Sequence, residues 1–232
     1  MIEILFEDED LVIVNKPAGI PSQATVDPKR PSMESLVRQQ LQLKKIYLHH
    51  RLDRDTTGVL LLSKSSRPNG KLTEMFQQHS FRKKYMAIAA KTHAISTNHS
   101  WIVENHLAPV RDAKKKLMRM VVVKKGGWLA HTEFQLVDEN ENAYLIVARP
   151  TTGRTHQIRV HLAQGKNPIL GDPLYGGGAV GKSLGVKRCL LHACELNFSH
   201  PLTGSVMTIS APVPDDFRLI FHSASCSNVL SD

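Results

Sequence analysis

The chain has 232 residues, of which 41% are hydrophobic and 22% charged, as is typical of a soluble globular protein. No apolar run approaches the length of a membrane span, and because a strand-like segment begins at Ile2 we expect no signal peptide. The net charge of +9 attracts polyanions, most often nucleic acid. It therefore indicates a class of partner but says nothing about the reaction. The three cysteines are an odd number without metal spacing, and we therefore expect a reducing compartment, the cytoplasm.

Hydrophobic patterning predicts many short strands and a few helices. Strands are predicted over residues 2–6, 11–14, 46–48, 59–62, 82–88, 120–123, 129–137, 143–148, 189–198 and 206–209. Helices are predicted over residues 33–41 (with Ser32 as the N-cap), 72–79, 154–164 and 214–222. This order is typical of an α+β fold with a mostly antiparallel mixed sheet. Because no repeat or linker separates two domains, we expect one domain over residues 1–222 and a frayed tail over 223–232.

Three connecting segments are predicted from composition. Residues 91–100 read as a loop, and residues 165–185, which are rich in Gly and Pro, read as another. Residues 111–119 hold five basic side chains, which indicate either an exposed basic loop or hairpin, or an ordinary solvated face.

Residues 49–58 (HHRLDRDTTG) place two arginines and two aspartates between two predicted buried strands, and end in a turn signature. Charges between core strands cost free energy unless they are paired or used. One interpretation is an ion-paired turn. Another is a carboxylate that rigid strands hold for nucleophilic or acid–base work on an anionic substrate. A glycosidase-like pair of Asp53 and Asp55 is a third, although such partners usually come from separate strands.

Residues 152–161 (TGRTHQIRVH) predict a sharp strand-to-helix turn, which Gly153 permits. Arg154 would then stand where the chain enters the helix and could project back across the sheet. Arg159, five residues later, would point elsewhere. Taken alone, this pattern favours a phosphate-contacting or surface-paired helix start over a catalytic role.

Residues 176–183 (GGGAVGKS) match the phosphate-binding loop pattern letter for letter. A working loop of this kind needs a buried strand before it and a long helix after it. Residues 171–175 (GDPLY) do not suit a core strand, and Gly185 interrupts any following helix. We therefore predict a flexible loop here and no nucleotide cofactor.

The histidines and cysteines also lack the spacing of a metal site. His49 and His50 are adjacent, so a strand would point them to opposite faces. His156 and His161 are five apart, which fits neither one helical face nor a zinc motif. The two cysteines that lie five apart in a predicted apolar strand are interpreted as buried thiols. We expect no metal.

Residues 50–58 (HRLDRDTTG) resemble the signature of the RluA-type pseudouridine synthases. Other stretches agree in the same order, namely residues 15–19 (NKPAG), 82–87 (RKKYMA), 152–161, 168–172 (PILGD), 175–176 (YG), 191–193 (LHA) and 200–204 (HPLTG). The likeness covers about residues 2–215. The chain departs from the family at Thr57, where Ser is usual, and in the Gly-rich insert. The small RNA-binding module of some members is not expected, because the family pattern begins almost at the first residue.

The resemblance implies an enzyme that isomerises uridine in RNA without metal or nucleotide cofactor. Such enzymes cut the bond from ribose to the ring nitrogen, rotate the uracil and rejoin it through carbon 5. Asp53 would be the catalytic carboxylate, which either attacks the anomeric carbon or removes a proton from the neighbouring ribose carbon. Tyr85 would stack on the flipped base and assist proton transfer. Arg154 would pair with Asp53 and hold it ionised.

The same resemblance implies the residues that bind RNA. Arg51 would fill the space that the flipped uridine leaves, and Ile158 would form an apolar wall of the pocket. The motif neighbours His50, Arg54 and Thr57 complete the implied set. The expected substrate is transfer RNA, ribosomal RNA or both, bound by a monomer that contacts no membrane. Two other classes stay open, a non-catalytic RNA-binding protein of the same fold and, less favoured by the flanking sequence, a phosphate-loop nucleotide-binding protein.

Overall fold

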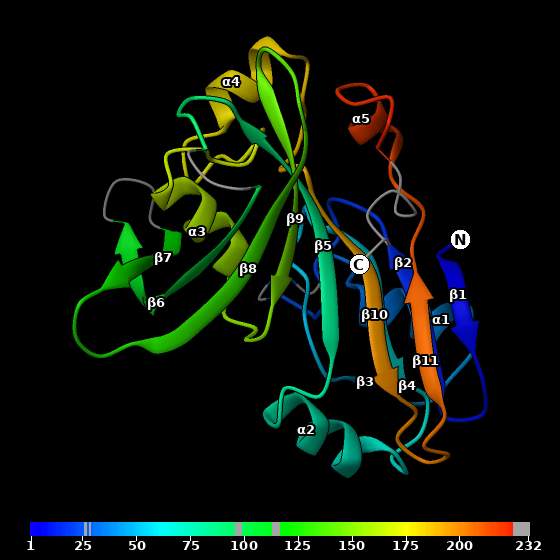
Figure 1. Ribbon diagram of the computed structural model, residues 1–232. Helices are drawn as coiled ribbons and strands as arrows, with labels where there is room; N and C mark the ends of the chain where they lie inside the picture. Colours follow the sequence, from blue (N-terminus) through cyan, green and yellow to red (C-terminus); the bar gives the residue numbers. More distant parts are fainter. Residues whose placement is uncertain (26, 28, 96–98, 113–116, 225–232) are drawn as a thin grey trace. The chain divides into compact units, whose positions relative to one another are not determined.

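The computed structural model describes residues 1–25, 27, 29–95, 99–112 and 117–224 (Figure 1). The chain forms two compact units. Unit 1 contains Met1–Lys83 and His192–Pro214, and unit 2 contains Lys84–Leu191 and Asp215–Ala224. The chain passes from one unit into the other and returns, so neither unit is a continuous stretch of sequence. Most of the predicted tail, residues 225–232, lies outside the described residues.

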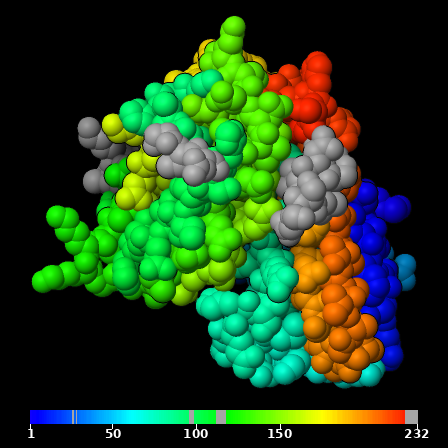
Figure 2. Space-filling view, viewed as in Figure 1, coloured from blue at the N-terminus to red at the C-terminus, as the bar shows by residue number. Residues whose placement is uncertain are grey.

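Unit 1 is built on strands in the order β1-β2-β4-β10, with β11 beside β10 and β3 beside β4. The strands are β1 (Glu3–Glu7), β2 (Leu11–Lys16), β3 (Tyr47–Leu48), β4 (Thr57–Ser63), β10 (Leu191–Ser199) and β11 (Val206–Ser210). The pair β4–β10 is parallel, and the other pairs in this unit are antiparallel. The helices are α1 (Met33–Gln40) and α2 (Asn69–Gln77). The strand β11, orange in Figure 2, lies at the surface and alternates exposed with half-buried residues.

The strand β4 lies at the centre of the core of unit 1. All seven residues of β4 (TGVLLLS) are buried, and β2 and β10 pair with it on its two sides. Alternate residues of β4 and β2 pack with α2 and β10 in one apolar cluster, which includes Leu11, Ile13, Leu61, Leu72 and Phe198. Each such side chain contributes about 1.5–3 kcal/mol by leaving water. The strand that follows the charged motif is therefore rigid.

Unit 2 is an antiparallel sheet in the order β5-β9-β8-β6-β7. Its strands are β5 (Arg82–Ala90), β6 (Ser100–Asp112), β7 (Leu117–Val123), β8 (Trp128–Glu139) and β9 (Ala143–Pro150). Its helices are α3 (Gln157–Gln164), α4 (Gly178–Ser183) and α5 (Asp215–Arg218). The predicted α+β class with mostly antiparallel strands is confirmed.

The strand β6 was not predicted from the sequence. Its residues mix polar and apolar side chains, and Pro109 breaks the pattern that a strand normally shows. The pairing of β6 with β8 ends at Leu107, so Pro109 pairs only with β7, at Met120. A missing N–H is tolerated there because no ladder on the β8 side requires it. β6 and β7 frame the predicted basic hairpin, whose residues 113–116 lie outside the described part.

The other differences from the predicted elements are local. Ser32 caps α1 as expected, with a capping box to Ser35. The strand expected over residues 46–48 is present as the two-residue β3, but its expected burial is wrong, because both residues of β3 are half-buried. The helix expected from Arg154 begins three residues later, at Gln157. The last helix, α5, has only four residues.

Within the described residues, no helix is long and apolar enough to cross a bilayer. Cys189 and Cys194 are buried thiols, as the sequence predicts.

Candidate active site

The charged motif forms a loop between β3 and β4 in unit 1. Asp53 is half-buried there, whereas Arg51 and Arg54 are exposed and Leu52 is buried between them. The N–H of Thr56 donates to the carbonyl of Asp53 over 3.1 Å, which closes a tight turn. The turn therefore presents one half-buried carboxylate between two exposed guanidinium groups.

A buried lysine anchors this turn from beneath. Lys16, the last residue of β2, is fully buried, although lysine is rarely so unless it is paired. Its Nζ donates to the carbonyl oxygens of Arg54 (2.8 Å), Thr56 (2.9 Å) and Pro17 (3.0 Å). The N–H of Gly19 also donates to the carbonyl of Arg54, over 2.9 Å. A cation that binds two carbonyls of the turn fixes the backbone on which Asp53 stands.

A serine holds the turn at its other end. The hydroxyl of Ser22 donates to the carbonyl of Leu52 over 2.8 Å, and it accepts the N–H of Leu52 over 3.0 Å. Both backbone groups of the residue before Asp53 are thus bound to one buried side chain. Neither Lys16 nor Ser22 was singled out from the sequence, although the motif NKPAG contained the lysine.

The turn joins β4 through Thr57 and Gly58, where the parallel neighbour β10 comes very close. Gly58 has a φ of 109°, and a Cβ there would overlap the carbonyl of Ala193, so only glycine fits. The hydroxyl of Thr57 lies 2.9 Å from Nδ1 of His192 and is buried. The stretches HRLDRDTTG and LHA are therefore in direct contact in the folded chain.

His50 is used inside unit 1. Its Nε2 accepts the N–H of Leu61 over 2.9 Å, and its ring stacks on Phe76 with the centroids 5.3 Å apart. Burial, with the positive charge of Lys83 and of His49, lowers the pKa of His50 from 6.5 to about 3. His50 is therefore neutral at pH 7. Arg54 pairs with Asp55, its Nε lying 3.2 Å from Oδ1.

Unit 2 holds the other predicted residues, Tyr85, Arg154 and Ile158. Tyr85 lies in β5 opposite Ala148 of β9, and it is half-buried, whereas its neighbours Lys84 and Met86 on the other face are buried. Ile158 is buried in α3, 5% exposed.

The turn before α3 presents Arg154, and one glutamine ties that turn to β8. Oε1 of Gln157 accepts the N–H of Arg154 (2.9 Å) and the hydroxyl of Thr152 (2.8 Å). Nε2 of Gln157 donates to the carbonyl of His131 and to the hydroxyl of Thr132, each over 2.9 Å. Nε of Arg154 itself donates to the carbonyl of Leu129, also over 2.9 Å. Gln157 is the positioning residue that sequence reasoning missed.

Arg159 has a structural task that separates it from Arg154. It is buried and makes a two-pronged ion pair with Asp172, with Nε to Oδ2 at 2.7 Å and Nη2 to Oδ1 at 2.9 Å. Asp172 also accepts the N–H groups of Leu174 and Tyr175. The stretch PILGD with its following tyrosine is thus the binding partner of α3.

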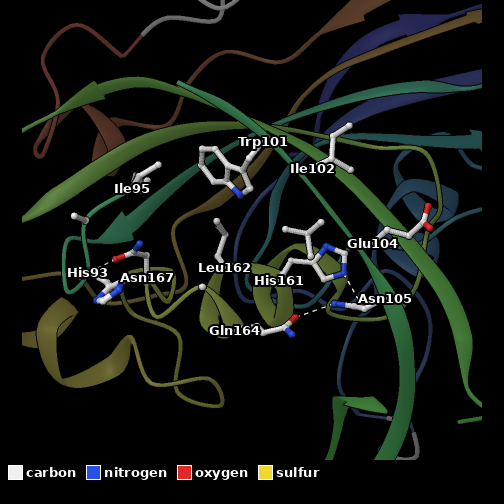
Figure 3. A pocket seen from close by; sticks show the side chains of 13 residues that line it. His93, Ile95, Trp101, Ile102, Glu104, Asn105, His161, Leu162, Gln164 and Asn167 are labelled. Carbon is white, nitrogen blue, oxygen red and sulfur yellow. Dashed lines mark hydrogen bonds between the residues drawn. The ribbon is translucent and has the colours of Figure 1, made fainter. Parts of the chain in front are cut away.

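A cavity of about 520 Å³ lies beside α3 in unit 2, and Figure 3 shows Trp101, His161 and Asn105 on its walls. The ring of His161 is bonded at both nitrogens, Nδ1 to the hydroxyl of Thr132 (3.0 Å) and Nε2 to Oδ1 of Asn105 (3.2 Å). Burial, and then the charge of His131, lower its pKa to about 4. His161 is therefore a neutral packing residue, and this cavity holds none of the predicted catalytic side chains.

The Gly-rich stretch differs from its prediction. Residues 176–183 do not form a flexible loop, because Gly178–Ser183 is the short helix α4. A Cβ on Gly177 would overlap the carbonyl of Ile169, and one on Gly181 would overlap the amide of Gly171. The glycines thus serve close backbone packing. Within the described residues, no group of three or more His, Cys, Asp or Glu side chains is placed to hold a metal ion.

Comparison with known proteins agrees with these motifs. The model of the family described as RNA pseudouridylate synthase matches residues 10–164, which include the anchored turn, β5 and α3. Ribosomal large subunit pseudouridine synthase D of Zymomonas mobilis is 33% identical over 98% of this chain and 74% of its own length. Ribosomal large subunit pseudouridine synthase C of Pasteurella multocida is 34% identical over 94% of this chain and 66% of its own length.

Solved structures agree on the fold. The human protein RNA Pseudouridylate Synthase Domain Containing 4 superposes with a TM-score of 0.73 at 25% identity, over 95% of this chain and 92% of that one. The human protein RNA Pseudouridylate Synthase Domain Containing 1 gives 0.74 at 20% identity, over 91% and 83%. The chain belongs to the RNA pseudouridylate synthase family, as a member of its RluA-type branch, and is an RNA pseudouridine synthase.

Proposed function

We propose that this enzyme isomerises uridines in structured ribosomal or transfer RNA through the carboxylate of Asp53. The observation that carries the proposal is the anchored turn. It presents Asp53 on a backbone that Lys16 and Ser22 bind from inside the protein. Ribosomal RNA is supported by the names of the relatives from Zymomonas mobilis and Pasteurella multocida.

The remaining residues take the parts that their positions allow. Arg51 is exposed beside Asp53, so its side chain is available to enter the gap that a flipped uridine leaves. Tyr85 stacks on the uracil, Ile158 walls the pocket, and Arg154 pairs with Asp53 to keep it ionised. Arg54 contacts the RNA backbone.

His50 and Thr57 support binding through the turn, because both side chains are bonded within unit 1. We propose that residues 1–222 are one catalytic domain. We propose that it works as a monomer in the cytoplasm.

The site of modification is tested by mapping pseudouridines in cells with and without this gene. Carbodiimide labels pseudouridine, and primer extension then stops at each labelled position. We expect stops in ribosomal or transfer RNA that vanish when the gene is deleted and return when it is restored. Identical maps in the two strains would contradict the proposed activity.

The reaction should need neither metal nor nucleotide. We expect EDTA to leave the rate of pseudouridine formation unchanged, and Lys182→Ala to alter it little. The physical reason is that the glycines around Lys182 pack against backbone instead of enclosing phosphates. The measurement is the initial rate on one RNA with EDTA, with ATP, and for the variant. A rate that falls on chelation and returns with Zn²⁺ would overturn this.

Arg51 and Arg154 should differ in their response to RNA structure. Arg154→Met leaves a half-buried carboxylate without its partner, which costs about 3 kcal/mol, or about 100-fold in rate, on any substrate. Arg51→Met should lose more on a stem-loop than on a short single strand, because unstacking a base costs a few kcal/mol only where stacking exists. Single-turnover rates of both variants on both RNAs measure this. Equal losses for Arg51→Met on the two substrates would show that it does not displace the base.

A further inference from the structure

A cavity of about 390 Å³ in unit 2 lies between the β6–β7 hairpin, the start of β8 and the turn before α3. Its lining includes two arginines, Arg119 and Arg154, and among the described residues no carboxylate lines it. The cavity is thus a basic recess whose lining includes Arg154. An anionic ligand is the chemistry that such a recess selects.

Arg119, one of the two arginines of the lining, has an unmet hydrogen bond. Its Nε is buried from solvent, and it is the one buried side-chain nitrogen or oxygen that has no hydrogen-bond partner within the described part of the chain. Buried donors in native proteins are normally satisfied by the protein, by water or by a ligand, so this nitrogen calls for an acceptor that the described side chains do not supply. The adjacent amide of Met120 is already satisfied, since it donates to the hydroxyl of Tyr175 over 2.9 Å. The unmet donor is therefore confined to the arginine side chain.

Trp128 gives the cavity an aromatic wall. It is the first residue of β8 and is 52% exposed, although tryptophan on a protein surface normally buries most of its ring. Met118, on the neighbouring hairpin, is likewise exposed. An exposed indole beside arginines is the arrangement that stacks a base and holds its phosphate.

We propose that this cavity binds one nucleotide of the RNA strand that carries the reacting uridine, with its phosphate on Arg119 and its base on Trp128. The inference rests on the proposed function, because that function makes RNA the substrate. Arg154, which takes part in the proposed reaction, also lines this cavity. Because any base can stack on an indole, we expect the cavity to bind an unpaired nucleotide whatever its base.

The two tryptophans of the chain allow an optical test. Trp101→Phe leaves Trp128 as the fluorophore in the cavity, and Trp128→Phe leaves Trp101, which lies in the separate cavity of Figure 3. Each variant is titrated with a cytidine nonamer, which the enzyme does not isomerise, with an abasic nonamer and with UMP. We expect the cytidine nonamer to quench Trp128 and to leave Trp101 unchanged. We expect the abasic strand, which has phosphates and no bases, to quench neither.

Affinity measurements separate base from phosphate. Trp128→Ala should weaken binding of the cytidine nonamer about tenfold and leave the abasic strand unaffected. Arg119→Gln should reduce the slope of log Kd against log salt by about 0.7, the value for one phosphate contact on a single strand. Arg111→Gln is the matched control, since Arg111 is exposed on the same hairpin and does not line the cavity. Thermal unfolding of each variant shows that it is folded.

Each outcome is decisive. No quenching of Trp128 by the nonamer, or an equal slope change for Arg111→Gln and Arg119→Gln, overturns the inference. Equal affinity for UMP and the nonamer would assign the cavity to free nucleotides instead of RNA. If cellular pseudouridines depend on the gene while Trp128 stays unquenched, the proposed function stands and this site fails. If Trp128 responds and no uridine is isomerised, the nucleotide site stands and the proposed function fails.

Discussion

Asp53→Asn is expected to abolish pseudouridine formation, with a rate reduced by about 10⁴-fold or more, while RNA binding persists. The amide has the shape of the carboxylate but carries no charge, so it neither attacks carbon nor accepts a proton. The turn should keep its geometry, because Lys16 and Ser22 bind backbone groups of the turn and not the Asp53 side chain in the contacts described. Single-turnover rates and filter binding on one RNA substrate measure the two effects separately.

Asp55→Asn is the matched control for this experiment. Asp55 lies two residues away on the same turn, is half-buried like Asp53, and pairs with Arg54. We expect its rate to stay within about tenfold of the wild type, since an exposed ion pair contributes about 0–1 kcal/mol. Equal losses in the two variants would favour a carboxylate pair as the catalytic unit, and near-normal turnover in Asp53→Asn would remove Asp53 from the mechanism.

Arg159→Met is expected to cost about 3–5 kcal/mol of unfolding free energy, because it leaves Asp172 charged, fully buried and without its cation. Chemical denaturation at pH 7 measures the loss. Lys71→Met is a suitable control, since Lys71 pairs with Glu74 on the exposed face of α2 and should contribute little. A loss below about 1 kcal/mol for Arg159→Met would show that the ion pair does not secure α3.

The loss should also depend on pH in a defined direction. Burial by itself raises the pKa of Asp172, but the hydrogen bonds and charge of Arg159, with two backbone N–H groups, hold that pKa below 3.8. In the wild type this carboxylate therefore contributes stability above about pH 3.8, which is lost as the pH falls through the folded pKa. In Arg159→Met burial prevails and the pKa rises, so the variant regains stability as the pH is lowered from 7. The difference in unfolding free energy between wild type and variant should narrow toward pH 4. A difference that does not change with pH would contradict this account.

The local sequence was sufficient to predict those elements whose structure depends on interactions between neighbouring residues. The Ser32 cap and the apolar spacing after it predict α1, because both act within one helical turn. The apolar run after the charged motif predicts β4, because a strand buried on both faces is mostly apolar. The motif itself indicated that Asp53 lies in a turn between strands. The sequence also placed a strand over residues 46–48, where β3 lies, but it overestimated how deeply that strand is buried, since burial depends on which elements pack against it.

The two arginines of the motif TGRTHQIRVH show where local sequence fails. They have the same side chain five residues apart, yet Arg154 stands in a half-buried turn and Arg159 is buried against Asp172. Which of them is structural depends on a carboxylate that lies thirteen residues further along the chain. Position in the helix alone cannot supply that partner. Pro109 in β6 is similar, because its tolerance depends on where a neighbouring strand stops pairing.

The sequence by itself determined the fold class, the family resemblance and the charged turn, because these follow from patterns within short stretches of chain. Only the tertiary structure decided what holds the turn in place. Nζ of Lys16 binds carbonyls 38 and 40 residues away in sequence, and Gly58 meets a strand that begins at Leu191. The cavity beside Trp128 and Arg119 likewise joins a hairpin to the turn before α3. A buried cation and a cavity are both defined by the atoms around them, and those atoms come together only when the chain has folded.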